Sequence, residues 1–197
     1  NAIKNFSMRI QRTSDYEKIV TDLKLLYEYC VNITCKSRKL KEQDPFLYMN
    51  LKIALEYVLL DAAGEKIFDA ISIQCIDESQ KFNKTLRKLS NISLEDLNIS
   101  KLVKNEQLTS LKLELLKIST CKCALDKLSC IRNVIEGISA LSEKKLTVTD
   151  EMLPILVYLV IKTNYFHWIP TLKFIKELNL SQMINPENHS SGSALLY

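Results

Sequence analysis

The sequence predicts an all-α fold, and three observations support this prediction. The chain has only three glycines and four prolines in 197 residues, so turns are scarce and long helices are favoured over many short strands. Apolar residues recur at helical spacing in most segments, and strand-like alternation does not persist anywhere. The 47% hydrophobic and 25% charged residues are typical of a globular domain with a sizeable core.

The first predicted helix opens at a pattern that resembles a capping box, at residues 14–17, and continues to about Lys39 with an apolar stripe along one face. The next helix starts at Asp44-Pro45. Pro is favoured in the first turn of a helix, where its missing N–H would have no partner, and Asp is a good capping residue. These start signals place two helices in the first part of the chain.

The second helix is expected to end or bend at Gly64, with a further apolar segment over 66–75. A more polar helix then opens at residues 77–79. Residues 93–97 resemble the capping box at 14–17, because a small polar residue is followed by acidic residues. This pattern predicts a short capped turn. We therefore expect an interrupted helix, a polar helix and a turn in this order.

Apolar residues also recur at helical spacing in the rest of the chain. Helical spacing of apolar residues predicts helices over 106–117 and 125–141, and another one that begins after Pro170. Residues 179–193 are polar and predict a loop. The last four residues, 194–197, resemble the beginning of a further helix that is cut short.

The most informative stretch is residues 149–164. Pro154 requires the first turn of a helix nearby, so this helix is expected to begin at about Asp150. The run from 152 to 161 has no charged residue. It is too short to span a membrane, so we expect a helix enclosed in the core. Asp150 and Glu151 then lie at its entrance, either as a cap and a complement to the helix dipole or as carboxylates aimed at a partner.

Charge and motifs exclude several function classes. The net charge is only +4, and the densest basic run, 36–41, is interpreted as a solvated helix end rather than a site for anionic lipid or phosphate. The sequence predicts no nucleic-acid binding, no membrane span, and no metal or cofactor site. Phosphate-binding glycine loops and nucleophile motifs are absent, and His167 and His189 have no sequence partner. Conventional catalysis on a small molecule is therefore disfavoured.

The six cysteines lack a zinc-binding spacing and are predicted to be reduced, mostly buried thiols. Seven matches to the glycosylation motif are attributed to chance, because several fall inside predicted helices. The chain does not begin with Met, and we expect it to be part of a longer protein. Trp168 is either a partner contact or an aromatic residue tucked against the core, and the second interpretation is favoured.

The order of segments resembles a known family, the vacuolar-protein-sorting-nine (Vps-nine) domain. The similar segments of the first half are Ala54-Leu55-Glu56-Tyr57, Glu65-Lys66-Ile67-Phe68, Asp77, Phe82-Asn83, Arg87-Lys88-Leu89 and Leu97-Asn98-Ile99. The second half resembles the family more closely. Its similar segments are Lys127-Leu128-Ser129-Cys130-Ile131, Thr149 to Tyr158, Lys162-Thr163-Asn164 and Leu172-Lys173-Phe174-Ile175. The resemblance covers about 46–197, and Lys162-Thr163 with Trp168 favour the ankyrin-repeat-bearing members.

The resemblance implies a layered helical bundle with an N-terminal supporting helix. Residues 1–43 would form a helical extension, and 44–197 the exchange domain with its last helix truncated. It also implies a guanine-nucleotide exchange factor for Rab GTPases of the Rab-five subfamily, which is not an enzyme acting on a small molecule. The alternative is a helical adaptor that binds a small GTPase or endosomal partner without releasing nucleotide.

The resemblance also assigns site residues. Asp150 corresponds to the family's acidic finger, which enters the GTPase near its P-loop Lys and Mg²⁺, and Tyr197 is the candidate for the Tyr that contacts the switch region. Further candidates for GTPase binding are Glu151, Pro154, Tyr158 and Asn164. The implied location is the cytoplasm, with recruitment to early endosomes through other parts of the protein and no cofactor.

Overall fold

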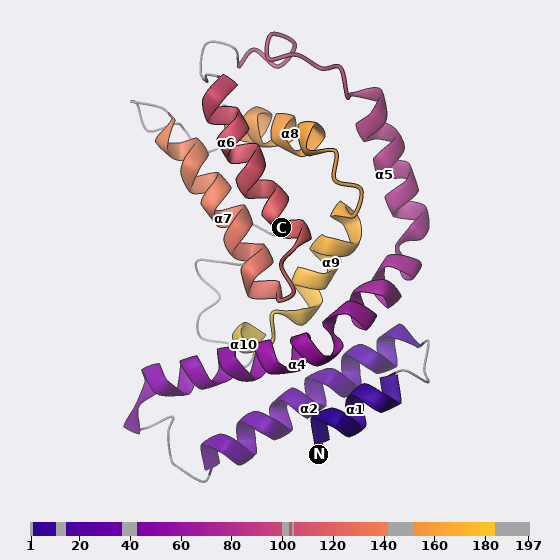
Figure 1. The fold of residues 1–197 in the computed structure, drawn as a ribbon, viewed down its shortest axis with the longest axis vertical. Coiled ribbons are helices and arrows are strands. Elements are labelled where there is room, and N and C mark those ends of the chain that lie inside the picture. The colour runs from indigo at the N-terminus through magenta and orange to yellow at the C-terminus, as the bar shows by residue number, and fades with distance from the viewer. Residues whose placement is uncertain are drawn as a thin grey trace. The chain divides into compact units, whose positions relative to one another are not determined.

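The structure is a computed structural model, and it describes residues 2–10, 15–36, 43–99, 103, 105–141 and 152–183. These residues form helices and turns, and none of them forms a strand, so the predicted all-α class is confirmed. The elements (Figure 1) are α1 (Ala2–Ile10), α2 (Tyr16–Lys36), α4 (Pro45–Gln74), α5 (Ile76–Lys88), α6 (Asn105–Leu116), the 3-10 helix η1 (Lys117–Ser119), α7 (Ala124–Ala140), α8 (Met152–Thr163), α9 (Trp168–Leu178) and α10 (Leu180–Met183).

The chain divides into two compact units, which are described separately. Unit 1 comprises Asn1–Gln74, Lys122–Ala124 and Pro170–Tyr197, and unit 2 comprises Cys75–Cys121 and Leu125–Ile169. Unit 1 therefore contains α1, α2, α4, most of α9 and α10. Unit 2 contains α5, α6, η1, α7 and α8.

Unit 1 is built around α2 and α4, which lie along each other (Figure 1). The second of these helices begins at the predicted Asp44, which accepts a hydrogen bond from the Leu47 amide at 2.9 Å. The first begins within the predicted pattern at 14–17, where Asp15 accepts a hydrogen bond from the Lys18 amide at 3.2 Å. Tyr27 on α2 is buried and its hydroxyl donates to the backbone carbonyl of Lys52 on α4 at 3.2 Å. Burial, followed by the charge of Glu56, raises the pKa of Tyr27 above its ordinary value.

Helix α4 continues through Gly64, so the expectation that it ends there is wrong, while the alternative of a bend at Gly64 stays a prediction. Gly64 is buried, and a β-carbon at this position would meet Leu60 Cβ and the Lys122 carbonyl oxygen at 3.6 Å, an ordinary van der Waals contact. Apolar residues on both sides of Gly64, among them Leu60 and Ile67, are fully buried. Their burial compensates for the low helix propensity of glycine. The helix ends at Gln74 instead, where Cys75 separates it from α5.

The C-terminal part of unit 1 contacts α4 through α9 and α10. The rings of Phe68 and Phe174 meet edge to face, with centroids 5.8 Å apart. The Ser181 amide at the start of α10 donates to the buried carboxylate of Glu56 at 2.8 Å. Helix α10 was predicted as loop, so that part of the prediction is wrong, while residues 184–193 lie outside the described part of the chain. Helix α1, which the sequence did not predict, also lies against α2 and α4.

In unit 2, α6 packs against α8, and α7 contributes buried apolar residues such as Val134 and Ile138. The predicted turn at 93–97 is present. Ser93 donates through its amide and hydroxyl groups to Asp96 at 2.8 Å, and both hydrogen bonds hold the pKa of Asp96 below its usual value. Lys127 is buried and its ammonium donates to the Ile118 carbonyl at 2.8 Å, which ties α7 to η1.

Candidate functional site

Helix α8 carries an exposed apolar strip. The side chains of Leu153 and Val157 are one turn apart and 60% and 39% exposed, and the half-buried Pro154 and Tyr158 follow each of them in the sequence. We call these four residues the α8 strip. The expectation of a helix enclosed on every side is therefore wrong, although Met152, Ile155 and Leu159 are buried. A helix that is apolar all round can also keep one side for a partner, which the sequence argument did not consider.

The predicted acidic residues at the helix entrance lie outside the described part of the chain. Asp150 and Glu151 belong to the undescribed range 142–151, and Tyr197 to the range 184–197. Pro154 is described and lies in the first turn of α8, as predicted, in a position where its missing N–H costs no hydrogen bond. The described part of the site therefore consists of the helix that follows Asp150.

Tyr158 is held in place by a neighbouring cation. The ammonium of Lys162, one turn further along α8, lies 5.4 Å from the centroid of the Tyr158 ring. The same ammonium donates to the carbonyl oxygen of Ser90 at 2.8 Å. Lys162 therefore links α8 to the segment that follows α5. The family resemblance of Lys162-Thr163-Asn164 drew attention to Lys162. The sequence could not indicate that its partner would be Ser90, 72 residues away.

Asn164 is exposed and ends α8. Its φ of 51° lies in the left-handed region, and its amide contacts the Ile161 carbonyl at 3.3 Å. Asn adopts this conformation more readily than most residues other than Gly, and such a residue commonly ends a helix. Asn164 therefore has a structural role at the end of α8, whether or not it also contacts a partner.

The connection from α8 to α9 is aromatic. Trp168 is 4% exposed and packs edge to face against Tyr165, with ring centroids 5.3 Å apart. The interpretation of Trp168 as a core aromatic is therefore confirmed, although it begins α9 and does not lie in a loop. Phe166, in contrast, is 36% exposed, and its backbone carbonyl accepts a hydrogen bond from the Asn83 side chain at 2.9 Å.

All six cysteines are free thiols. Half of them, Cys75, Cys123 and Cys130, are buried, and the other three are half-buried. The sulfur atoms of Cys121 and Cys130 are 3.6 Å apart. Burial, together with the hydrogen bond to Cys121, raises the pKa of Cys130 to about 12. Cys130 is therefore protonated at neutral pH and cannot act as a nucleophile there.

No single described helix is long and apolar enough to cross a membrane. The bent pair formed by α8 and residues 168–182 reaches the required length and composition only when the two helices are counted together. Within the described ranges, no three His, Cys, Asp or Glu side chains lie close enough together to hold a metal ion.

Exposed apolar side chains next to one another on a helix can serve as a contact for another protein. The comparison with protein families identifies the kind of domain. The family model described as "Vacuolar sorting protein 9 (VPS9) domain" matches residues 108–190. This range of the chain therefore carries a VPS9 domain, and the resemblance drawn from the sequence is confirmed for it.

The matched range extends from within α6 to beyond α10 and includes the α8 strip and Asp150. A VPS9 domain is a domain type of Rab guanine-nucleotide exchange factors. Tyr197 and residues 46–107 lie outside the match, and their resemblance to the family stays a prediction. The relation to the ankyrin-repeat-bearing members also stays a prediction.

The sequence did not identify Leu153 and Val157 as site residues. Val157 was assigned to the core, and Leu153 was interpreted as mainly structural with an edge in the binding groove, because an uninterrupted apolar run carries no periodicity that distinguishes its exposed side from its buried side. The signal that could have found them is their i, i+4 spacing next to Pro154 and Tyr158, which were both candidates. Exposure itself depends on where α6 covers α8, and the sequence does not contain that information directly.

Proposed function

We propose that this chain is a guanine-nucleotide exchange factor that releases GDP from a Rab GTPase, with Asp150 as the acidic finger. The match of residues 108–190 to the VPS9 domain is the observation that carries the proposal. The Rab-five subfamily is the proposed substrate class, and early endosomes are the proposed site of recruitment, as the sequence resemblance implies. Support for Asp150 comes from its place four residues before Pro154, at the entrance of α8.

The proposed mechanism is electrostatic. A GTPase holds GDP through the P-loop Lys and through Mg²⁺ on the phosphates. A carboxylate inserted into that site pairs with the Lys, disfavours the metal ion and repels the β-phosphate. Release accelerates about tenfold for each ~1.4 kcal/mol of nucleotide binding that is cancelled. The exchange factor therefore needs to supply one anion in a fixed position.

The α8 strip is the proposed docking surface for the switch regions of the GTPase. Its exposed residues, Leu153 and Val157, begin three residues after Asp150, so the anion and the apolar contact are close together in the sequence. Burying one such side chain at an interface contributes about 1.5–3 kcal/mol. Pro154 and Tyr158 would border the contact, and Glu151, Asn164 and Tyr197 are the further candidates.

The proposal is tested by measuring release of fluorescently labelled GDP from a panel of purified Rab proteins. We expect the chain to accelerate release from at least one Rab of the Rab-five subfamily. The double variant Leu153→Ser/Val157→Ser should reduce this acceleration at least about tenfold, because two apolar contacts are lost. The control Ile73→Ser changes a side chain that is 74% exposed on α4 and should leave the rate unchanged.

The alternative function, an adaptor without exchange activity, makes the opposite prediction. If the chain binds a Rab protein but accelerates GDP release from none of them, the exchange proposal is wrong and the adaptor replaces it. If the double variant exchanges as fast as the original chain, the α8 strip is not the docking surface.

A further inference from the structure

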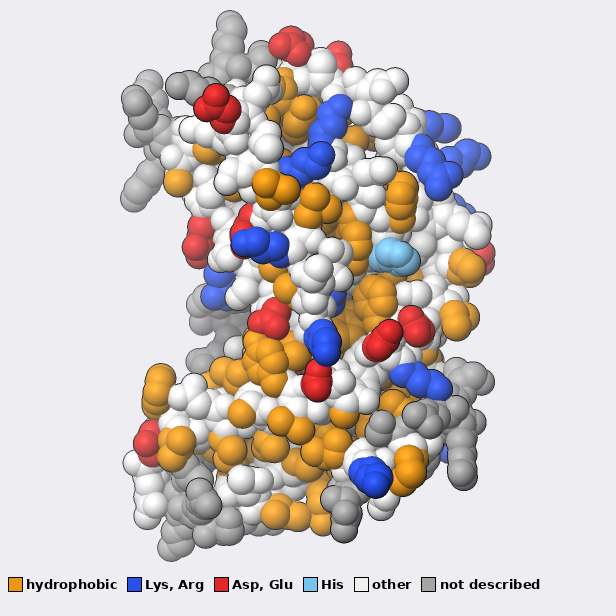
Figure 2. Space-filling view, viewed as in Figure 1, with side chains coloured by type: hydrophobic (Ala, Val, Ile, Leu, Met, Phe, Trp, Pro, Cys, Tyr) orange, Lys and Arg blue, Asp and Glu red, His pale blue; other side chains and the backbone are white. Residues whose placement is uncertain are grey.

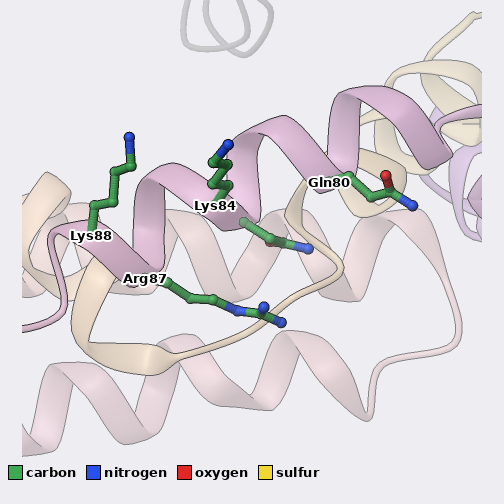
Figure 3. Close-up of a pocket in the computed structure, with 5 residues that line it drawn as sticks. Gln80, Lys84, Arg87 and Lys88 are labelled. Carbon is green, nitrogen blue, oxygen red and sulfur yellow. The ribbon is translucent and has the colours of Figure 1, made fainter.

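Helix α5 carries a basic depression that the proposed exchange function does not use. The depression has a volume of about 510 Å³ and is lined by Gln80, Asn83, Lys84, Arg87 and Lys88. Figure 3 shows Lys84 and Lys88 extending from the helix in the same direction, one turn apart, while Arg87 extends in another. Lys and Arg side chains also gather over α5 in Figure 2. Three cations and two amides therefore line the depression, without an acidic side chain.

The three cations are not paired with an acidic side chain of the residues that the structure describes. Within the described part of the chain, Lys84, Arg87 and Lys88 form no ion pair. The acidic residues of α5, Asp77 and Glu78, lie in its first turn, and at 1.5 Å per residue Glu78 is about 9 Å along the axis from Lys84. The positive charge at the C-terminal half of α5 is therefore available for a ligand.

The guanidinium of Arg87 is oriented by unit 2 itself. It lies 5.4 Å from the centroid of the Phe166 ring. The Phe166 backbone is in turn tied to α5, because Asn83 Nδ2 donates to the Phe166 carbonyl oxygen at 2.9 Å. A guanidinium held against an aromatic face keeps its N–H groups free at the edge, where they can bind a phosphate through two hydrogen bonds.

The simpler explanation is that the cations only compensate the negative C-terminal end of the helix dipole. That effect accounts for Arg87 and Lys88, which lie in the last turn, and contributes about 0.3–1 kcal/mol each. It does not account for Lys84, which lies one turn earlier. It also does not account for the position of the Arg87 guanidinium, 5.4 Å from the centroid of the Phe166 ring. These two features point to a ligand.

We propose that the α5 depression binds a compact anion with clustered phosphate groups, such as a multiply phosphorylated inositol. Arg87 would bind one phosphate in a bidentate manner, and Lys84 and Lys88 would act as point charges on its neighbours. Gln80 would face a hydroxyl group of the ring, while Asn83 holds the Phe166 backbone beside it. The cations span less than two turns of α5, which fits a small ligand better than an extended polymer.

The phosphate groups belong either to a free inositol phosphate or to a lipid headgroup, and two measurements distinguish these sources. Inositol hexakisphosphate is titrated into the chain by calorimetry. Sedimentation with phosphatidylcholine vesicles that contain phosphatidylinositol bisphosphate is compared with sedimentation with vesicles brought to the same charge by phosphatidylserine. Binding in the first measurement alone assigns a soluble ligand, and preference for the bisphosphate vesicles assigns the lipid. No binding in either measurement overturns the proposal.

Three variants distinguish binding in the α5 depression from nonspecific electrostatic binding. Lys84→Ala and Arg87→Lys should each weaken binding at least about fivefold, the second because it keeps the charge but loses the planar fork. Lys81→Ala is the matched control. Lys81 is exposed on the same helix but does not line the depression, so its loss should change binding less than about twofold. Melting temperatures of all variants verify that they are folded.

Equal losses for Lys84→Ala and Lys81→Ala would mean that binding follows net charge, and the site would be rejected. Equal affinity for a single-stranded oligonucleotide would also contradict a site for clustered phosphates. GDP release from a Rab protein in solution, without lipid or inositol phosphate, should be the same for all three variants. The proposed exchange function can therefore fail or hold independently of this site.

Discussion

Asn164 belongs to a segment that resembles a functional motif, but its role in ending α8 is enough to explain why Asn occupies this position. The sequence marked it as a candidate contact for a GTPase. In the structure, its left-handed conformation with φ of 51° ends α8. Residues with a β-carbon adopt this conformation at a cost, and Asn is one of the few that tolerate it. The end of α8 and the start of the aromatic connection therefore depend on this residue.

The two roles of Asn164 are separated by substitution. Asn164→Gly should leave the free energy of unfolding unchanged or slightly higher, because Gly adopts positive φ freely, whereas Asn164→Ala should lower it by about 1 kcal/mol. Chemical denaturation measures both values. If the side chain also contacts the GTPase, Asn164→Gly will slow GDP release although the chain remains stable. Equal stability of the Gly and Ala variants would contradict the structural role.

Glu56 is a second residue whose role became visible only in the structure. The sequence included it in a motif of the family resemblance, but Glu is almost never fully buried unless it is paired. In unit 1 it has no exposed surface, lies one turn from the equally buried Lys52, and accepts the Ser181 amide at 2.8 Å. A partner 125 residues away cannot be identified from local pattern. The carboxylate therefore serves to hold α10 against α4.

Removing the carboxylate should destabilise unit 1. Glu56→Ala leaves the buried Ser181 amide without its acceptor, so we expect a loss of about 1–3 kcal/mol in the free energy of unfolding. Glu56→Gln keeps an acceptor for the amide and should lose less. Glu65→Ala, an exposed position on the same helix, should stay within about 0.5 kcal/mol. Urea denaturation compares the three variants, and a Glu56→Ala variant as stable as Glu65→Ala would refute this account.

At the scale of elements, helix starts were predicted better than helix interiors. Asp15 and Asp44 cap their helices through local hydrogen bonds, and such local chemistry is written in neighbouring residues. Gly64 was expected to end or bend a helix for an equally local reason, but α4 does not end there, because burial of the surrounding apolar side chains stabilises the continuous helix. Helix α8 was recognised by its apolar run and its Pro154, whereas its exposed strip depends on which side the other helices of unit 2 cover.

Gly64 offers a direct test of that interpretation of α4. Gly64→Ala places its β-carbon at ordinary contact distances, so the gain in helix propensity should raise stability by about 0.5–1 kcal/mol. The matched control is Gly137→Ala in α7. A β-carbon there would overlap with Leu111 Cδ2, and its gain should be smaller or reversed. Thermal melting distinguishes the two variants, and a lower melting temperature for Gly64→Ala would show that α4 needs the flexibility of glycine.

For the whole molecule, the sequence predicted the all-α class and most of the helices, because apolar period and capping residues are local signals. It did not predict the connections that join distant segments. Examples are Asn83 to Phe166 and Lys162 to Ser90, which shape the basic depression and the end of α8. It also did not predict α1. A short amphipathic helix such as α1 is marginal alone and gains its stability from the helices against which it packs.

Only some residues of the candidate site could be predicted, because exposure depends on contacts between distant segments. Pro154 and Tyr158 were candidates from the family resemblance, while Leu153 and Val157 joined the proposed docking surface only when their exposure was known. Asp150, Glu151 and Tyr197, which lie outside the described residues, remain predictions. The match to the VPS9 domain covers the first two of these and not the third. The exchange proposal therefore depends most on Asp150.

The most direct test of that proposal is the rate of labelled GDP release from a responsive Rab protein with two variants of Asp150. Asp150→Asn keeps a capping side chain but removes the negative charge, and Asp150→Ala removes both. We predict that both variants slow release at least about tenfold, while Asp150→Asn unfolds at the same denaturant concentration as the original chain. Unchanged release with Asp150→Asn would contradict the proposal, because it would show that the carboxylate charge does not displace the nucleotide.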